Sequence, residues 1–160
     1  IYFPKSILPL SKVGVALVEL VFPLLLLILM ILYYGKPILW TIVFIPLILY
    51  YNIICALCIV FWFSIFSYIK RDLLHVLPFI LQFGIWFAPV FFSTTILPDR
   101  FAIIMNFNPM ANVVQLWRWS LFGYGQFNYL WLLNMVLVTL LTLLGMYFYT
   151  KKESQFVDFV

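Results

Sequence analysis

The side chains that could do chemistry are few in this chain and lie far apart. Cys55 and Cys58 share one apolar run without a second pair of ligands or a nearby histidine, so we interpret them as small packing residues rather than a zinc site. His75 follows Lys70 and Asp72 closely, which favours a position near lipid headgroups over a proton relay. No Ser, His and acid set, carboxylate pair or metal-ligand cluster occurs in the sequence. The sequence therefore predicts no enzyme site and no metal or cofactor of its own.

The chain also lacks the phosphate-binding loop G-x-x-x-x-G-K-[ST], so it cannot hydrolyse ATP by the usual route. The intramembrane charge pairs and matching broken repeats of ion-coupled transporters are missing as well. If the protein takes part in transport, the energy must come from a partner subunit.

Isolated polar residues remain inside the apolar runs. Glu19 lies seven residues after Lys12, two turns along the same helical face, and snorkelling to the interface explains it about as well as function does. Asn52, Gln82 and Asn134 are expected to make hydrogen bonds between helices, which is the usual role of such residues within membrane spans.

The elements that position these residues must lie in a membrane. The chain is 67% hydrophobic and 9% charged, and a soluble domain of 160 residues could not hide that much apolar surface in one core. The net charge is +4, but the basic residues are spread over membrane flanks and form no stripe for nucleic acid. We conclude that the chain is an integral membrane protein in contact with lipid, with no nucleic-acid partner.

Four segments contain the roughly 20 mostly apolar residues that a spanning helix needs. They are residues 13–34, 39–68, 73–92 and 129–149. None alternates polar and apolar residues as a barrel strand must. The turn Gly35-Lys36-Pro37 joins the first two into a hairpin. The predicted fold is all-α: a polytopic helical bundle with four spans.

The distribution of basic residues predicts the orientation of these spans. Cations concentrate in the flanks and loops that fall on one side, and the positive-inside rule places that side, with both ends of this chain, in the cytosol. The tail at 150–160 is then cytosolic. One side holds Lys5, Lys12, Lys70, Arg71, Lys151 and Lys152, and the other holds Lys36, Arg100 and Arg118.

The segment 93–128 is too apolar for a solvated loop and too broken to span. Pro98-Asp99-Arg100 and Asn106-Phe107-Asn108-Pro109 divide it into short pieces. Between Pro109 and Gly123 the pattern predicts an amphipathic helix that begins at the proline and ends at the glycine. Met110, Val113, Val114, Trp117 and Leu121 form its apolar face, and Asn112, Gln115 and Arg118 gather on another. We expect re-entrant helices on the outer side; the alternative is an interfacial helix that anchors the last span.

Residues 1–12 are apolar but interrupted by Pro4 and Pro9, and they carry two cations. A short cytosolic element against the membrane is one interpretation, with Tyr2 and Phe3 available to a partner protein. An ordinary membrane-flanking segment fits the composition equally well. Because the chain begins at Ile1 without a methionine, we expect it to be a fragment of a longer protein.

A series of short motifs in a fixed order covers nearly the whole chain, and with them the sequence resembles permeases of ABC transporters that export polysaccharides or polyol phosphates. The motifs are Tyr2-Phe3-Pro4-Lys5, Ile7-Leu8-Pro9-Leu10-Ser11, Tyr33-Tyr34-Gly35, Arg71-Asp72, Leu77-Pro78-Phe79, Leu81-Gln82, Ala88-Pro89-Val90, Leu97-Pro98, Asn108-Pro109-Met110, Arg118-Trp119 and Leu121-Phe122-Gly123.

The resemblance implies a six-span permease of which this chain holds the third to sixth spans. Residues 1–12 would be the cytosolic coupling segment that docks on an ATPase subunit, and 93–128 would hold the re-entrant helices near the exit. Such permeases work in the bacterial cytoplasmic (inner) membrane as dimers with separate ATP-binding cassette chains, which bind ATP and Mg. Their cargo is a lipid-linked glycan of the O-antigen, capsule or teichoic acid type.

On this interpretation several residues acquire expected roles. Tyr2, Phe3, Pro4 and Lys5 would transmit cassette motion. Lys70 and Arg71 would attract the pyrophosphate of a polyprenyl-linked substrate, although the positive-inside rule alone would place them there. The remaining candidates are aromatic residues of the substrate path, Trp86, Phe87, Phe91 and Phe92, together with Arg118, and the re-entrant residues Asn108, Pro109, Trp117 and Trp119.

Three alternatives stay open from the sequence. The aromatic residues would serve either as a smooth wall for sugar faces or as an ordinary interfacial belt. A second alternative is a permease that exports drugs or lipids in place of a glycan. A non-transporting membrane scaffold, with the broken segment as a protein-binding surface, is the third.

Overall fold

The structure is a computed structural model that describes residues 7–70, 72–92, 96 and 98–152. Within these residues the regular elements are all helical, which confirms the all-α class. Three stretches are long and apolar enough to cross a membrane. They lie in α1 (Ile7–Tyr33), in the short 3-10 helix η1 (Trp40–Phe44) continued by α2 (Ile45–Ile69), and in α6 (Tyr129–Lys152).

The expected span at 73–92 is shorter in the structure. Its helix, α3 (Leu73–Phe87), has 15 residues and ends five residues early. Ala88 takes an extended backbone, with ψ at 139°, because the proline ring of Pro89 disfavours a helical conformation in the residue before it. At about 1.5 Å per residue α3 is some 22 Å long. Among the described residues there are thus three helical stretches of spanning length and one shorter apolar helix of 10–17 residues, α3.

Helices α2 and α6 form the centre of the molecule. Gly145 of α6 faces Trp62, and a Cβ at that glycine would lie 3.0 Å from the indole nitrogen. The same nitrogen donates a hydrogen bond to the carbonyl oxygen of Leu141 at 3.1 Å. A small residue therefore lets the two helices approach closely, as is common in membrane bundles. The buried core around them consists of Ile48, Tyr51, Cys55, Val113, Leu116, Trp131 and Val138.

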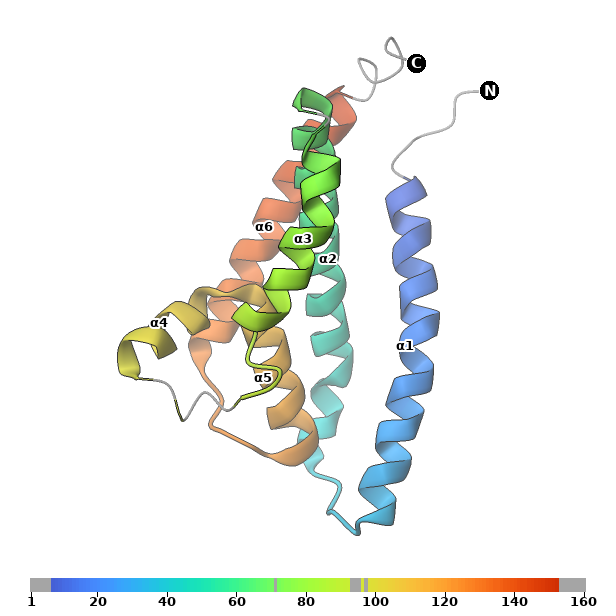
Figure 1. Cartoon of the computed structure of the whole chain (residues 1–160). Helices are drawn as coiled ribbons and strands as arrows, with labels where there is room; N and C mark the ends of the chain where they lie inside the picture. Colours follow the sequence, from blue (N-terminus) through green and yellow to red (C-terminus); the bar gives the residue numbers. More distant parts are fainter. Residues whose placement is uncertain (1–6, 71, 93–95, 97, 153–160) are drawn as a thin grey trace.

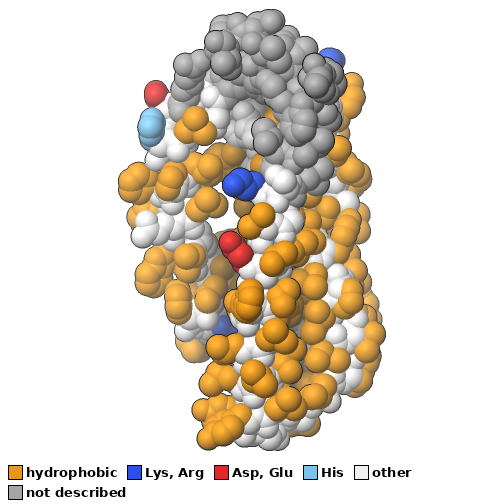
Figure 2. All heavy atoms as spheres, turned by 90° about the vertical axis from the view of Figure 1, so that its right-hand side faces the viewer, with side chains coloured by type: hydrophobic (Ala, Val, Ile, Leu, Met, Phe, Trp, Pro, Cys, Tyr) orange, Lys and Arg blue, Asp and Glu red, His pale blue; other side chains and the backbone are white. Residues whose placement is uncertain are grey.

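Helix α1 stands to one side of this centre (Figure 1). Among the side chains that the structure describes in α1, Ile31 is the one that is buried. Most of the others are exposed and apolar, and the face of the molecule in Figure 2 is largely hydrophobic, with few charges. Lipid or another apolar surface is the environment that such a face requires.

The helices alternate in direction, so the connections gather at two ends (Figure 1). The start of α1, the turn between α2 and α3, and the end of α6 lie at one end. Lys12, Lys70 and Lys151 belong to these segments. The turn at Gly35, whose φ is 62°, lies at the opposite end together with Lys36. We call these the lysine-rich end and the hairpin end; which of them faces the cytosol remains a prediction.

Candidate functional site: the α4–α5 helix pair

Two short helices fill the segment between α3 and α6. They are α4 (Asp99–Phe107), with 9 residues, and α5 (Pro109–Phe122), with 14. Their lengths of about 14 Å and 21 Å are both below the roughly 30 Å of a bilayer core. Asn108 alone joins them, and α5 runs back toward the hairpin end (Figure 1). The pair therefore turns within the bundle.

The sequence explains where α5 begins and ends. The Asn108 Oδ1 accepts a hydrogen bond from the backbone nitrogen of Met110 at 3.0 Å, and Pro109 occupies the first turn. Gly123 ends the helix in a left-handed conformation with φ at 66°. A Cβ at Gly123 would lie 2.8 Å from Leu39 Cδ1, so only glycine suits the position. The predicted proline start and glycine stop are confirmed.

Asparagine side chains satisfy the turn between the two helices, residues 106–109, which we call the tip. Asn134 of α6 donates from Nδ2 to the carbonyl oxygens of Phe107 at 2.8 Å and Asn106 at 3.3 Å. Asn112 donates to the same Asn106 oxygen at 2.8 Å. The Tyr51 hydroxyl of α2 donates to Asn134 Oδ1 at 3.0 Å. The last carbonyls of a helix have no partner within it, and these bonds supply partners in an apolar setting.

The pair is also attached to the end of α3. Asn108 Nδ2 donates to the carbonyl oxygen of Phe87 at 3.0 Å. Arg118 donates from Nη1 to the Phe92 oxygen at 3.1 Å and from Nη2 to the Val90 oxygen at 2.9 Å. The guanidinium is charged, and a hydrogen bond from a charged donor to a carbonyl oxygen is stronger than one between neutral groups.

A reciprocal pair of hydrogen bonds attaches α5 to η1. The Thr41 Oγ1 donates to the Ser120 carbonyl oxygen at 2.8 Å, and the Ser120 Oγ donates to the Thr41 carbonyl oxygen at 2.9 Å. Both side chains are buried. The helix pair is thus hydrogen-bonded to η1, α3 and α6, and α5 packs against α2 in the buried core.

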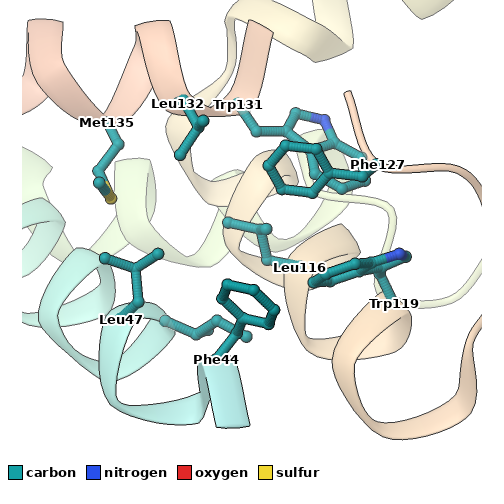
Figure 3. A pocket seen from close by; sticks show the side chains of 9 residues that line it. Phe44, Leu47, Leu116, Trp119, Phe127, Trp131, Leu132 and Met135 are labelled. Atoms are coloured by element: carbon teal, nitrogen blue, oxygen red, sulfur yellow. The ribbon is translucent and has the colours of Figure 1, made fainter. Parts of the chain in front are cut away.

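Aromatic rings close the space between α2, α5 and α6. Phe44, Trp119, Phe127 and Trp131 surround a small apolar pocket, and their rings point toward one another (Figure 3). The ring centroids of Trp119 lie 5.5 Å from Phe44 and 5.2 Å from Phe127. Such contacts stabilise packing beyond the area they bury. Trp119, predicted as a re-entrant residue, therefore packs in the interior of the bundle.

The structure sets Lys70 apart from the other described substrate-path residues, which lie together: the ring centroids of Trp86 and Phe91 are 5.8 Å apart, and Arg118 donates to the Phe92 carbonyl oxygen. Lys70 is exposed at the lysine-rich end, where its backbone nitrogen closes the last turn of α2 on Phe66. Trp86, Phe87 and Phe91 are about 70% exposed on or just after α3, and Phe92 is half-buried. Arg71 and the coupling residues Tyr2, Phe3, Pro4 and Lys5 lie outside the described residues.

Other polar predictions had mixed outcomes. The hydrogen bonds expected of Asn134 are confirmed, whereas Asn52 and the exposed Gln82 make none with the part of the chain that the structure describes. Asn112 is completely buried and Met110 is 42% exposed, so burial on α5 does not follow the division into apolar and polar residues at these two positions. Trp117 is half-buried against the core cluster.

Sequence reasoning missed Tyr51, Thr41 and Ser120 as anchors of the pair. A tyrosine, a threonine and a serine within apolar runs are common, and nothing in their spacing signals a partner some 80 residues away. No group of three or more His, Cys, Asp or Glu side chains that could hold a metal occurs among the described residues. What the arrangement shows is a firmly attached helix pair.

Comparison with known proteins finds similar sequences but no matching family model. No model of a protein family and no solved structure matches it. Two curated proteins of Klebsiella pneumoniae, each named O-antigen export system permease protein RfbA, are 26% and 25% identical to it over 159 and 158 residues. The matches cover 98% of this chain and 61% of each relative's length. The chain is thus similar in sequence to two O-antigen export permeases, which agrees with the resemblance carried by its motifs.

Proposed function

We propose that the chain forms part of the membrane-spanning permease of an ATP-driven exporter that moves a lipid-linked polysaccharide across the cytoplasmic membrane. The observation that carries the proposal is the similarity to two O-antigen export permeases along 98% of the chain. Three apolar helices of spanning length fit a permease subunit. The chain spans about three fifths of its relatives' length, so the activity of a whole permease is part of the proposal.

The driving partner would be a separate ATP-binding cassette subunit, which holds ATP and Mg, and a second permease copy would complete the pathway. The segment 1–12 is the proposed coupling element, with both ends of this chain in the cytosol. The α4–α5 pair, which turns back within the bundle, is the proposed re-entrant element at the outer side. Lys70 and Arg71 would meet the charged head of the cargo at the cytosolic mouth.

The test is surface polysaccharide in a strain that lacks the gene. The deletion is expected to abolish the lipid-linked glycan at the surface and to leave it in the cytosolic leaflet, and the intact gene should restore export. An unchanged surface glycan would refute the proposal and direct attention to export of drugs or lipids. Co-purification of an ATP-binding subunit tests the partner separately, because a scaffold would not require one.

The coupling assignment has its own test. Charge reversal at Lys5 or removal of the ring at Phe3 is expected to impair export while membrane insertion, measured by membrane fractionation, stays normal. Lys36→Glu is a matched charge reversal at the opposite, hairpin end and should leave export closer to normal. Normal export by both the Lys5 and the Phe3 variants would eliminate residues 1–12 as the coupling element.

A further inference from the structure

Helix α3 is loosely packed along its length and buried just beyond its end. None of its own side chains is buried among those described. The two residues that follow it are buried, Ala88 at 5% exposure and Pro89 at less than 2%. The attachment of α3 to the molecule is therefore concentrated at its carboxyl end.

The side-chain hydrogen bonds at that end come from one helix, α5, whereas the body of α3 lies against α2. Asn108, at the amino end of α5, holds the Phe87 oxygen, and Arg118 holds the oxygens of Val90 and Phe92. The two donors are ten residues apart, or about 15 Å along a helix axis. An attachment at two separated points resists rotation as well as translation. The guanidinium bonds are charge-assisted and stronger than neutral ones.

We propose that α3 and α5 move as one body, and that Asn108 and Arg118 are the positioning residues that join them. A displacement at the lysine-rich end of α3, next to Lys70, is then transmitted to α5 and to the tip beside α6. Among the described polar attachments of α5, those of Arg118 to the segment that follows α3 are charge-assisted, whereas the bonds to η1 and α6 are uncharged; apolar packing in the core also joins α5 to α2 and α6. This inference goes beyond the proposed function and holds for any cargo.

Spin-label distances in the purified protein in lipid nanodiscs test the link. Single cysteines replace the exposed Phe83 of α3 and Phe122 at the end of α5, in a background with Cys55 and Cys58 changed to Ala. A second pair joins Phe83 to the exposed Leu29 of α1, the helix that stands to one side of the core. The α3–α5 distance distribution is expected to be narrow and the α3–α1 distribution broader. An α3–α5 distribution as broad as the α3–α1 one would overturn the proposal.

Variants then identify the residues responsible. Arg118→Gln combined with Asn108→Ala is expected to lose the narrow α3–α5 peak, and Arg118→Lys, which keeps the charge on a single ammonium, is expected to keep part of it. Gln115→Ala, on the same helix, is the matched control and should leave the peak intact. An unchanged peak in the double variant contradicts the proposal. The measurement needs no export activity, so failure of the proposed function would not affect it.

Discussion

At the scale of single residues, side-chain amides and hydroxyls supply the hydrogen bonds that water would otherwise supply to backbone carbonyls. The carbonyl oxygens of Asn106 and Phe107 end a helix inside an apolar bundle, where an unpaired polar group costs several kcal/mol. Asn134 reaches both oxygens from a neighbouring helix, and Tyr51 in turn orients its amide. The Asn134 side chain has no reactive chemistry, and it contributes to stability because it lies within hydrogen-bond distance of these groups.

Asn134→Leu is expected to destabilise the protein by about 1–3 kcal/mol, since it leaves the Phe107 carbonyl and the Tyr51 hydroxyl without their partner, while the Asn106 carbonyl keeps its bond from Asn112. The measurement is the melting temperature of the purified protein in detergent. Asn52→Leu is the matched control, an asparagine of α2 without such bonds to the described residues, and is expected to change stability little. Equal melting temperatures for the two variants would count against the anchoring role of Asn134.

At the scale of elements, glycines mark the places where helices end or approach closely. Gly123 ends α5 at a positive φ and beside Leu39, and Gly145 lets the Trp62 ring lie on α6. Gly35 has a positive φ but no neighbour within 4 Å, and Gly84 has neither constraint. Substitutions at these four glycines can therefore distinguish the cost of backbone strain from the cost of a clash with a neighbouring side chain.

Gly123→Ala is expected to destabilise the protein more than Gly35→Ala does. Both substitutions place a Cβ on a left-handed residue, which costs about 1–2 kcal/mol. Only the first also forces Leu39 Cδ1 away from a position 2.8 Å from the new atom. Thermal unfolding of the two variants side by side measures the difference. If Gly35→Ala proves as harmful, the contact with Leu39 contributes nothing.

Gly145→Leu is expected to separate α2 from α6 and to cost about 1–3 kcal/mol, the usual range for overpacking. The added atoms would enter the space of the Trp62 indole and break its bond to the Leu141 oxygen. Trp62 fluorescence and thermal unfolding are the readouts. Gly84→Leu on the open face of α3 is the control and should unfold at or above the wild-type temperature, because leucine favours the helix.

At the scale of the whole molecule, the long helices alternate in direction, which places the α2–α3 turn at the lysine-rich end and the turn at Gly35 at the hairpin end. Lys36→Cys and Lys70→Cys, each in a background without Cys55 and Cys58, are expected to react from opposite sides of intact cells or inverted vesicles with a membrane-impermeant maleimide. Lys36→Cys should be labelled from outside. Labelling of both positions from one side would refute the fold's topology, and labelling of Lys36→Cys from inside alone would reverse its orientation.

The sequence by itself determined the membrane class, the long helices and the breaks at Pro98, Asn108 and Gly123. These features depend on local hydrophobicity and on backbone chemistry, which a single segment carries in full. It overestimated the helix that begins at Leu73, although Pro89 already signalled the stop. The burial of individual α5 residues could not be predicted from the sequence, because helical spacing does not show which face of a helix a neighbouring helix will cover.

Only the tertiary structure decided what the polar residues within the apolar runs do. Asn134 and Asn52 look alike in sequence, yet one lies beside the open carbonyls of the tip and the other does not. Arg118 looked like a residue of a substrate path, and in the structure its guanidinium holds the carbonyls that follow α3. The physical reason is that a hydrogen bond needs a donor and an acceptor within about 3 Å of each other. Folding brings them together from positions tens of residues apart.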